Sequence, residues 1–377
     1  IIGAFLTGDL FNLYVWFEVL LIASFGLMTL KGSRPQFAGA FKYVTINMVA
    51  SLMFLSSLAL IYGISGTLNM ADLARKIAEP GDHFLLHSAA LLLLTAFGIK
   101  AAVFPLYFWL PASYHTAPIP IAAIFAGLLT KVGVYALIRV FSLIFTGYTG
   151  FTHTLLLVLG VLTMFSGVLG AAVQSDFRRI LSFHIISQIG YMILGLALYS
   201  PLALAGTVFY LIHHIIVKSN LFLVAGMVHR LKGRFDVYAL GGIYLQYPWL
   251  AVLFFIPAFS LAGVPPLSGF WAKLFIIKAG LDLKAWLSVF AALVVGLLTL
   301  FSMTKIWAEV FWKKDVKTAS VEEGTAGIYI TQWLPVTGLA LVTVLIGLAA
   351  GPVFEIASRT AHQLLDTSMY INAVLGE

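Results

Sequence analysis

The sequence predicts an all-α protein that crosses a membrane many times, and three observations carry that prediction. Of its 377 residues, 61% are hydrophobic and 10% are charged, whereas a soluble domain has about 25% charged residues. The mean hydropathy is +1.01. The hydrophobic residues gather in ten stretches, each of about 20 residues, the length that a helix needs to cross a hydrocarbon core of about 30 Å.

The predicted spans are, in chain order, Leu10–Leu30, Phe41–Tyr62, Leu85–Leu110, Ile119–Ile144, Leu155–Val173, Leu181–Leu198, Leu202–Val228, Trp249–Ala279, Trp286–Phe311 and Trp333–Ala350. Ile1–Thr7 reads as the end of an earlier span, so we expect a fragment whose first helices precede Ile1. The run MADLARKIA, inside the polar stretch Asn69–His83, predicts a short helix at the membrane surface. No Pro/Ser-rich linker separates the spans, which indicates a single transmembrane domain over residues 1–377.

The net charge of +7 comes mostly from basic residues in short loops, which indicates membrane orientation and not nucleic-acid binding. Four basic clusters follow alternate spans: Lys31, Arg34 and Lys42; Arg178 and Arg179; Arg230, Lys232 and Arg234; Lys313, Lys314 and Lys317. The opposite loops hold Arg75 and Lys76, offset by Asp72, Glu79 and Asp82. If each span crosses once, the four clusters share one side, which the positive-inside rule makes cytoplasmic, and the C-terminus lies outside.

The composition also excludes several kinds of chemistry. The chain has no cysteine, which excludes disulfides, thiolate metal sites and cysteine-held iron–sulfur clusters. It shows no Ser–His–acid pattern, phosphate loop or metal-ligand spacing. We therefore expect no cofactor, no metal site and no enzymatic activity of this chain by itself.

Two of the predicted spans are interrupted, and each carries a lysine at the interruption. Lys100 precedes Pro105 by five residues in FGIKAAVFP, and Lys273 follows the interruption Gly263–Gly269 in GVPPLSGFWAK. A charged lysine inside a bilayer costs roughly 3 kcal/mol even on the lenient insertion scale, which argues for a function. Broken helices in two halves of a chain are typical of ion pathways in transporters. The alternative for Lys100 is a side chain that reaches back to the membrane surface.

Two further ionisable residues lie near the middle of predicted spans. Glu18 has apolar neighbours on every side in LYVWFEVLLIA, and Lys131 lies centrally in AGLLTKVGVYALI. An intramembrane carboxylate is paired, protonated or exposed to water. Glu18 is therefore either part of an ion path or a protonated structural residue. We expect it to form an ion pair with Lys100.

The stretch FYLIHHIIVKSNLF adds histidines to this set. His214 and Lys218 are four residues apart and share one helical face, whereas His213 points elsewhere. A histidine exchanges protons near neutral pH, so these side chains suit a proton relay, although a packed hydrogen-bond cluster is the alternative. His184 is a further possible member of the relay, with helix–helix hydrogen bonding as its alternative role.

These segments resemble a known family. TGDLFNLYVWFEVLLIASFGLM, FGIKAAVFPLYFWLPASYHTAPIPIAA, LLTKVGVYALIR, SDFRRILSFHIISQIGYM and LAGVPPLSGFWAKL are similar to the antiporter-like subunits of respiratory complex I and of the Mrp multisubunit sodium/proton antiporters. The resemblance covers essentially the whole chain. Within the family the sequence most resembles the D-type subunits of the Mrp antiporters.

The resemblance implies a fold of fourteen helices with two inverted five-helix repeats, each holding one broken helix. Residues 1–144 then form the rest of the first repeat, 153–312 the second, and 333–377 a final helix and tail. It also implies that Glu18 and Lys100 are the family's glutamate–lysine pair, Lys131 the central lysine, His214 and Lys218 the relay of the eleventh helix, and Lys273 the exit lysine. His213 has no counterpart in this pattern.

Two functions fit the resemblance. One is a subunit of a hetero-oligomeric antiporter in the bacterial inner membrane, which exchanges sodium for protons together with partner subunits. The other is a proton-pumping subunit of complex I or of a membrane-bound hydrogenase. A purely structural scaffold fits poorly with six ionisable residues inside spans: Glu18, Lys100, Lys131, His214, Lys218 and Lys273.

Overall fold

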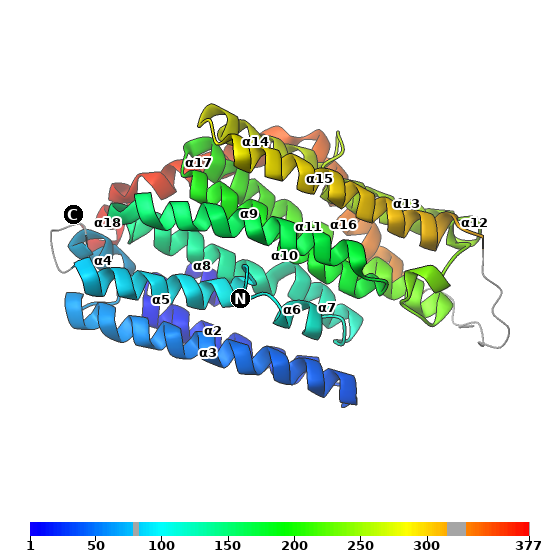
Figure 1. Ribbon diagram of the computed structural model, residues 1–377, viewed down its shortest axis with the longest axis horizontal. Coiled ribbons are helices and arrows are strands. Elements are labelled where there is room, and N and C mark those ends of the chain that lie inside the picture. Colours follow the sequence, from blue (N-terminus) through cyan, green and yellow to red (C-terminus); the bar gives the residue numbers. More distant parts are fainter. Residues whose placement is uncertain (78–82, 315–328, 377) are drawn as a thin grey trace.

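The computed structural model describes residues 1–77, 83–314 and 329–376, and every regular element in these ranges is helical (Figure 1). The elements are α1 Ile2–Leu6, α2 Leu10–Met28, α3 Arg34–Ser65, α4 Met70–Ile77, α5 His83–Ala101, α6 Trp109–Ser113, α7 Ile119–Ile124, η1 Phe125–Leu129, α8 Thr130–Leu143, η2 Thr146–Tyr148, α9 Thr149–Val173, α10 Phe177–Leu198, α11 Pro201–Lys232, η3 Val237–Ala239, α12 Ile243–Gln246, α13 Pro248–Ala262, α14 Ser268–Asp282, α15 Trp286–Ile306, η4 Trp307–Trp312, α16 Ile330–Leu348, α17 Ala350–Leu365 and α18 Thr367–Leu375. Within the described residues, nine helices are long and apolar enough to cross a bilayer, and α13 is a shorter apolar helix. The prediction of an all-α multi-pass membrane protein is confirmed.

Local sequence sets the ends of several spans. Asp9 accepts a hydrogen bond from Asn12 N at 2.8 Å at the start of α2, and Asp176 caps α10 in the same way. Gly66 and Gly233 end α3 and α11 with a φ of 70°, a left-handed conformation that glycine adopts at little cost.

Both predicted interruptions are present. α5 ends at Ala101, and the next helix, α6, begins only at Trp109. α13 ends at Ala262, Gly263 takes a φ of 95°, and α14 begins at Ser268. Carbonyls freed by such breaks need partners inside the protein. Trp109 Nε1 donates to Ile99 O at 3.0 Å, and Lys273 Nζ donates to Ala262 O at 2.9 Å.

The C-terminal segment differs from the expected tail. α16 is followed at once by α17, which packs along α11, and then by α18, which packs against α4. Ala357 and Ala361, four residues apart on one face of α17, have no exposed surface. Small residues allow close helix contact but add little hydrophobicity, which is why the sequence pattern did not indicate a packed helix here.

The basic clusters lie at one end of the bundle, as their alternation along the chain predicts. The connection after α9 pairs with the one after α11 through Asp176 and Asp236, and Gly242 N donates to Lys313 O at 2.6 Å. The start of α3, after Lys31, points to the same end as α12, on the right in Figure 1. Lys317, Glu79 and Asp82 lie outside the described residues.

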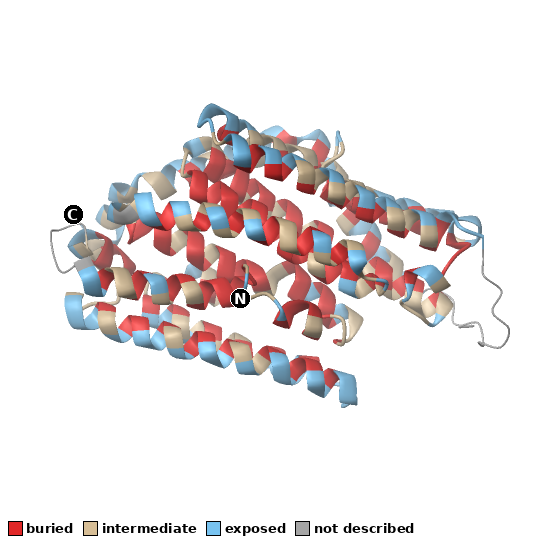
Figure 2. Cartoon of the chain, in the orientation of Figure 1, coloured by how far each residue is buried: buried red, intermediate tan, exposed pale blue. Residues whose placement is uncertain are grey.

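Burial is greatest in the helices at the centre of the bundle (Figure 2). In α10, 94% of the most apolar window is buried inside the protein, so this helix has almost no surface for lipid. By contrast, α2 and α3 expose large apolar side chains such as Ile22 and Phe41, at 73% and 71%. Polar side chains on α10 and α11 are therefore shielded from lipid by other helices.

Candidate functional site

The predicted site residues come from six helices: Glu18 from α2, Lys100 from α5, Lys131 from α8, His184 from α10, His213, His214 and Lys218 from α11, and Lys273 from α14. Lys131 and Lys218 have no exposed surface, and Lys100 and Lys273 are each 7% exposed. A side chain that reaches the membrane surface would expose its amine. Lys100, whose alternative role is to reach the membrane surface, instead directs its amine to Ser51 and Asn47 inside the protein.

Glu18 and Lys100 are joined by a third residue. Ser51 of α3 donates a hydrogen bond to Glu18 Oε1, and Lys100 Nζ donates to Ser51 Oγ at 3.1 Å. Lys100 Nζ also lies 3.4 Å from Asn47 O and 5.4 Å from the centre of the Phe17 ring. The ion pairs within 4.0 Å in the described ranges do not include Glu18 with Lys100, so the expected direct pair is replaced by a bridge through the Ser51 hydroxyl.

Lys131 lies directly after a change of helical geometry. The π-helical turn η1 precedes it, and Lys131 Nζ donates to the carbonyl of Ala126 within that turn. Thr130 Oγ1 lies 3.3 Å from the same amine. A π-turn widens the helix and leaves a backbone carbonyl available to a side chain. The amine is thus held by the backbone of its own helix, with no described carboxylate beside it.

The segments just before the helix of Lys131, α7 and η1, contact α11 closely. A Cβ at Gly127 would stand 2.3 Å from Ser219 Oγ, and Ser219 Oγ donates to Ala123 O at 3.2 Å. Ser219 directly follows Lys218 in α11, and η1 directly precedes the helix of Lys131. Lys131 is therefore the neighbour of the relay predicted on α11.

Several buried polar atoms around α11 have no hydrogen-bond partner among the described residues. They are both ring nitrogens of His214, Nδ1 of His184, Nε2 of His213, Ser187 Oγ, Gln188 Nε2 and both amide atoms of Asn220. Most buried polar groups in proteins are hydrogen-bonded. Internal water is a common partner for such groups where a site is polar. The arrangement fits a hydrated path through the centre of the bundle.

Two other buried atoms in this region, Nε2 of His184 and Nζ of Lys218, do have hydrogen-bond partners. His184 Nε2 lies 2.8 Å from Ser302 Oγ of α15, which is the helix–helix hydrogen bond expected as its alternative role. Lys218 Nζ donates to Leu181 O of α10 at 3.2 Å. His184 is thus held by a hydroxyl of α15, and Lys218 by a backbone carbonyl of α10.

A pair of hydroxyl groups connects α11 to the second broken helix. His213 Nδ1 lies 2.8 Å from Ser268 Oγ, and Ser268 Oγ lies 3.1 Å from Ser260 Oγ. Ser260 Oγ accepts from Gly269 N at 3.1 Å. A Cβ at Gly269 would stand 1.7 Å from Ser260 O and 2.9 Å from His213 Cε1, so only glycine permits this approach. His213, which the family pattern leaves unassigned, is thereby linked to the interruption before Lys273.

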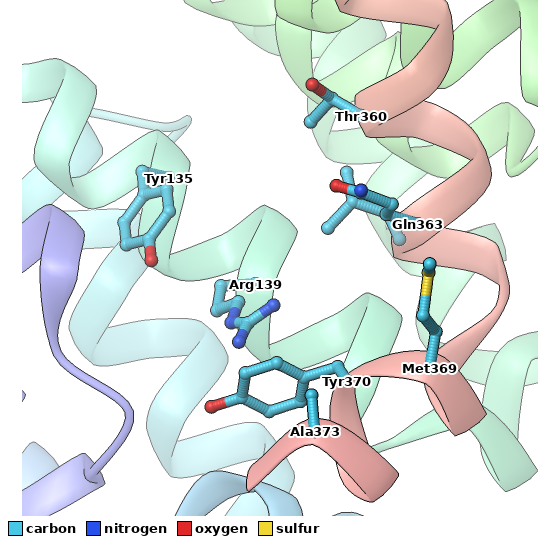
Figure 3. Close-up of a pocket in the computed structure, with 8 residues that line it drawn as sticks. Tyr135, Arg139, Thr360, Gln363, Met369, Tyr370 and Ala373 are labelled. Atoms are coloured by element: carbon cyan, nitrogen blue, oxygen red, sulfur yellow. The ribbon is translucent and has the colours of Figure 1, made fainter.

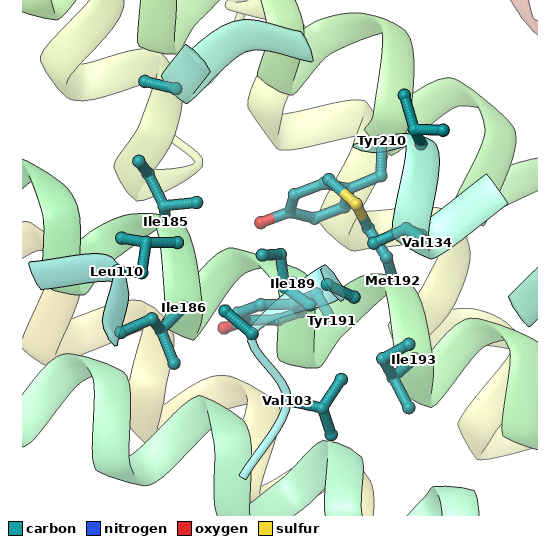
Figure 4. Close-up of a cluster of buried hydrophobic side chains, with 14 of the residues drawn as sticks. Val103, Leu110, Val134, Ile185, Ile186, Ile189, Tyr191, Met192, Ile193 and Tyr210 are labelled. Atoms are coloured by element: carbon teal, nitrogen blue, oxygen red, sulfur yellow. The ribbon is translucent and has the colours of Figure 1, made fainter. Parts of the chain in front are cut away.

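Two stacked tyrosines, Tyr191 and Tyr210, lie next to His213, and Figure 4 shows their rings within the apolar core. The rings of Tyr191 and Tyr210 are 5.5 Å apart and inclined by 17°. Tyr210 donates to Gln188 Oε1 and meets His213 edge-on at 5.7 Å. Lys273 Nζ lies 5.0 Å from the centre of the Tyr191 ring. The ring pair therefore contacts the histidines on one side and the lysine of the second broken helix on another.

At the basic end, a loop of the first half contacts a helix of the second half. His115, between α6 and α7, has Nδ1 2.7 Å from Pro111 O and Nε2 3.2 Å from an Arg179 nitrogen. Because a carbonyl only accepts, Nδ1 carries the hydrogen and Nε2 accepts from Arg179. Burial, together with the charge of Arg179, lowers the pKa of His115 below its ordinary value of 6.5.

The sequence and fold match those of known proteins. A family model described as "NADH:quinone oxidoreductase/Mrp antiporter, TM" matches residues 7–299. The chain belongs to this family. The resemblance expected from the sequence segments is thereby confirmed.

Named relatives within the family are similar over the whole chain. A D-type Na(+)/H(+) antiporter subunit of Alkalihalophilus pseudofirmus is 51% identical over 375 residues, which cover 100% of this chain and 76% of the relative. The D-type Na(+)/H(+) antiporter subunit of Bacillus subtilis is 42% identical, with the same two coverages.

Solved structures of the family share the fold. A chain in the Mrp complex from a Dietzia species superposes with a TM-score of 0.90 at 36% identity, covering 99% of this chain and 77% of that one. A chain in respiratory complex I from Thermus thermophilus gives 0.77 at 26% identity, covering 94% and 76%. The antiporter-like fold expected from the sequence is thus confirmed.

Sequence reasoning missed the hydroxyl groups that connect the charged residues. Ser51 gave no signal, because a serine inside a membrane helix usually bonds to its own backbone, as Ser51 also does to Asn47 O at 3.0 Å. Ser268 did have a signal, since it begins a helix at the interruption GVPPLSG. Asn220, two residues after Lys218, is an amide inside a span and could have been singled out on that ground.

Proposed function

We propose that this chain is a membrane subunit of a multisubunit cation/proton antiporter, and that it moves protons along a buried Glu/Lys/His relay in exchange for sodium. The observation that supports this most is a series of buried ionisable groups between the two broken helices. Lys100 stands at one break and Lys273 at the other, with Lys131, His214 and Lys218 between them. The partners are other subunits of the complex, the transported ions and the lipid bilayer.

The relay divides into two linked parts. In the first, a carboxylate beside an ammonium favours the protonated amine, so a change in the Glu18–Ser51–Lys100 arrangement changes where the proton rests. In the second, protons pass from the Lys131 region to His214 and Lys218 across water held by the unpaired buried atoms. His213 and Ser268 then connect this region to the Lys273 break.

Exchange of ions is favoured over redox-driven pumping by the comparisons. Relatives named as D-type antiporter subunits reach 51% and 42% identity. The matched chains of complex I and of an archaeal membrane-bound sulfane sulfur reductase reach 26% and 27%. Because these relatives are named as antiporter subunits, we assign this chain an ion-transport role without catalysis of its own.

We assign the basic end to the cytoplasm and the opposite end, with α18, to the outside of a bacterial inner membrane. The repeats of the fold then comprise residues 1–144 and 153–312, and residues 333–377 form the final helices. The relay runs between the two repeats, roughly along the membrane plane.

Substitution of Lys273 tests the proposal. Arginine keeps a positive charge but stays protonated, since its pKa exceeds about 12. Lys273→Arg and Lys273→Ala should both abolish ΔpH-driven sodium exchange in everted vesicles, while Lys278→Arg, an exposed position on the same helix, retains it. Wild-type exchange by Lys273→Arg, in complexes that assemble on a native gel, would remove Lys273 from the relay.

A further inference from the structure

A cavity separate from the relay lies between α8 and the two C-terminal helices. Its volume is about 410 Å³, and its walls include Tyr135 and Arg139 from α8, Gln363 from α17 and Tyr370 from α18. Figure 3 shows these side chains around the open space. Lys131, Tyr135 and Arg139 are spaced by four residues and share one face of α8. The cavity therefore continues the face of α8 that carries the central lysine.

Arg139 faces this cavity without an anionic partner. Its guanidinium carbon lies 4.0 Å from the centre of the Tyr370 ring. Among the described residues it makes no hydrogen bond and no ion pair, and its buried Nε has no partner. Arginine stays charged and presents five donors in a rigid fork. Stacking on Tyr370 stabilises the charge in part, but leaves these donors available to an anion.

The rest of the lining is partly polar and partly apolar. Thr360, Gln363 and Met369 lie across the open space from Tyr135 and Arg139 in Figure 3, and Leu364 also lines the cavity. None of the described residues that line the cavity carries a carboxylate. The nearby Asp366 instead caps α18 by accepting from Ser368 N at 3.2 Å.

The position of Arg139 near the end of α8 is consistent with the level of lipid headgroups. Arg139 is four residues before Leu143, where α8 ends, a rise of about 6 Å. This is the depth at which a span leaves the hydrocarbon and meets the phosphates. Arginine binds phosphate through two parallel hydrogen bonds, and basic pockets between membrane helices are typical headgroup sites.

We propose that this cavity binds the phosphodiester headgroup of an anionic membrane phospholipid, with Arg139 as the phosphate ligand. Gln363 and Thr360 add neutral hydrogen bonds, and Leu364 and Met369 contact the start of an acyl chain. The bound lipid would then hold α17 and α18 against α8. This inference does not depend on the proposed transport function.

Lipid retention measured by native mass spectrometry tests the site. The full-length chain, purified in mild detergent with the proteins that accompany it, is titrated with phosphatidylglycerol, with phosphatidylcholine and with inorganic phosphate. We expect saturable binding of phosphatidylglycerol that phosphatidylcholine and inorganic phosphate do not displace. Arg139→Gln should weaken it at least about tenfold, because glutamine lacks the charge and the two parallel donors of the guanidinium.

Arg359→Gln is the matched control. Arg359 is an exposed arginine on α17 that pairs with Glu355 at 2.5 Å and lies outside the cavity lining. The Arg359→Gln variant should bind phosphatidylglycerol as the wild type does. The proposal is overturned if the wild type shows no preference for phosphatidylglycerol, or if Arg139→Gln and Arg359→Gln bind equally. The lipid titration of the wild-type protein tests the proposal even if Arg139→Gln does not fold. A protein segment that filled the cavity would abolish the preference of the wild type for phosphatidylglycerol and would therefore overturn the proposal.

Discussion

Gly133 of α8 lies against the backbone of Lys100 of α5, so that a Cβ at position 133 would stand 2.8 Å from the Lys100 carbonyl carbon. The helices that carry Lys100 and Lys131 are therefore in backbone contact. Lys131 is only two residues from Gly133, and the turn that holds its amine precedes it directly. The end of α5 and α8 therefore touch through their backbones, with no side chain between them at this point.

Gly133→Ala should destabilise the protein and slow exchange. The added methyl group would also stand 2.6 Å from Ala101 N, and backbone cannot move away as a flexible side chain can. Overpacking of this kind costs about 1–3 kcal/mol. Thermal unfolding of the purified protein measures the loss. Gly63→Ala, at a helical glycine whose Cβ meets nothing within 4 Å, should not lower the melting temperature; equal melting of the two variants would contradict the close approach.

Ser51→Ala should reduce sodium/proton exchange about tenfold, because a hydrogen bond to a charged group contributes about 1.5–3 kcal/mol. The substitution removes the hydroxyl that lies between Glu18 and Lys100. Ser65→Ala is the control on the same helix, since the Ser65 hydroxyl donates to Ile61 O at 2.7 Å and contacts no charged side chain in the described hydrogen bonds. Vesicle assays on both variants decide the matter, and unchanged exchange in Ser51→Ala would exclude the bridge from the mechanism.

Ser268→Ala should interrupt the link between α11 and the second broken helix. His213 Nδ1 would lose its contact at 2.8 Å, so we expect exchange to fall about tenfold, with a shifted pH profile because the histidine loses its hydrogen-bond partner. Ser182→Ala controls for loss of a buried hydroxyl, because among the described residues the Ser182 hydroxyl donates only to Arg178 O of its own helix, at 2.7 Å. A normal rate and pH profile in Ser268→Ala would show that protons take another route to Lys273.

His115 should make stability depend on pH in a defined window. Its pKa in the folded protein is lowered by burial and by Arg179, so the unfolded chain takes up the proton at higher pH than the folded protein does. The resulting contribution of His115 to the free energy of unfolding is fully present above about pH 6.5 and is lost as pH falls toward the lowered pKa. When the melting temperature is measured between pH 5 and 8, it should fall less toward acid pH in His115→Gln than in the wild type. The exposed His362→Gln should leave it unchanged, and identical curves for wild type and His115→Gln would contradict this account.

The sequence predicted the spans, the two interruptions and the buried lysines, because hydrophobic length and proline–glycine breaks are local properties. It could not predict which groups the charges meet. Lys218 bonds to Leu181 O, and Lys131 to Ala126 O. Backbone carbonyls have no sequence signature, and they become available only when helices pack or a π-turn forms. The sequence predicted that Glu18 and Lys100 interact, but it could not predict that the Ser51 hydroxyl lies between them, because α3 brings Ser51 there by tertiary packing.

The central claim is that protons pass through the middle of the bundle, and Lys218→Met tests it most directly. Lys218 has no exposed surface, and methionine retains an unbranched apolar stem while removing the proton site. ΔpH-driven sodium exchange is measured in everted vesicles, beside Lys278→Met at an exposed position and with assembly verified on a native gel. The account predicts background exchange in Lys218→Met and wild-type exchange in Lys278→Met. A fully assembled Lys218→Met complex that exchanges sodium for protons at the wild-type rate would contradict it.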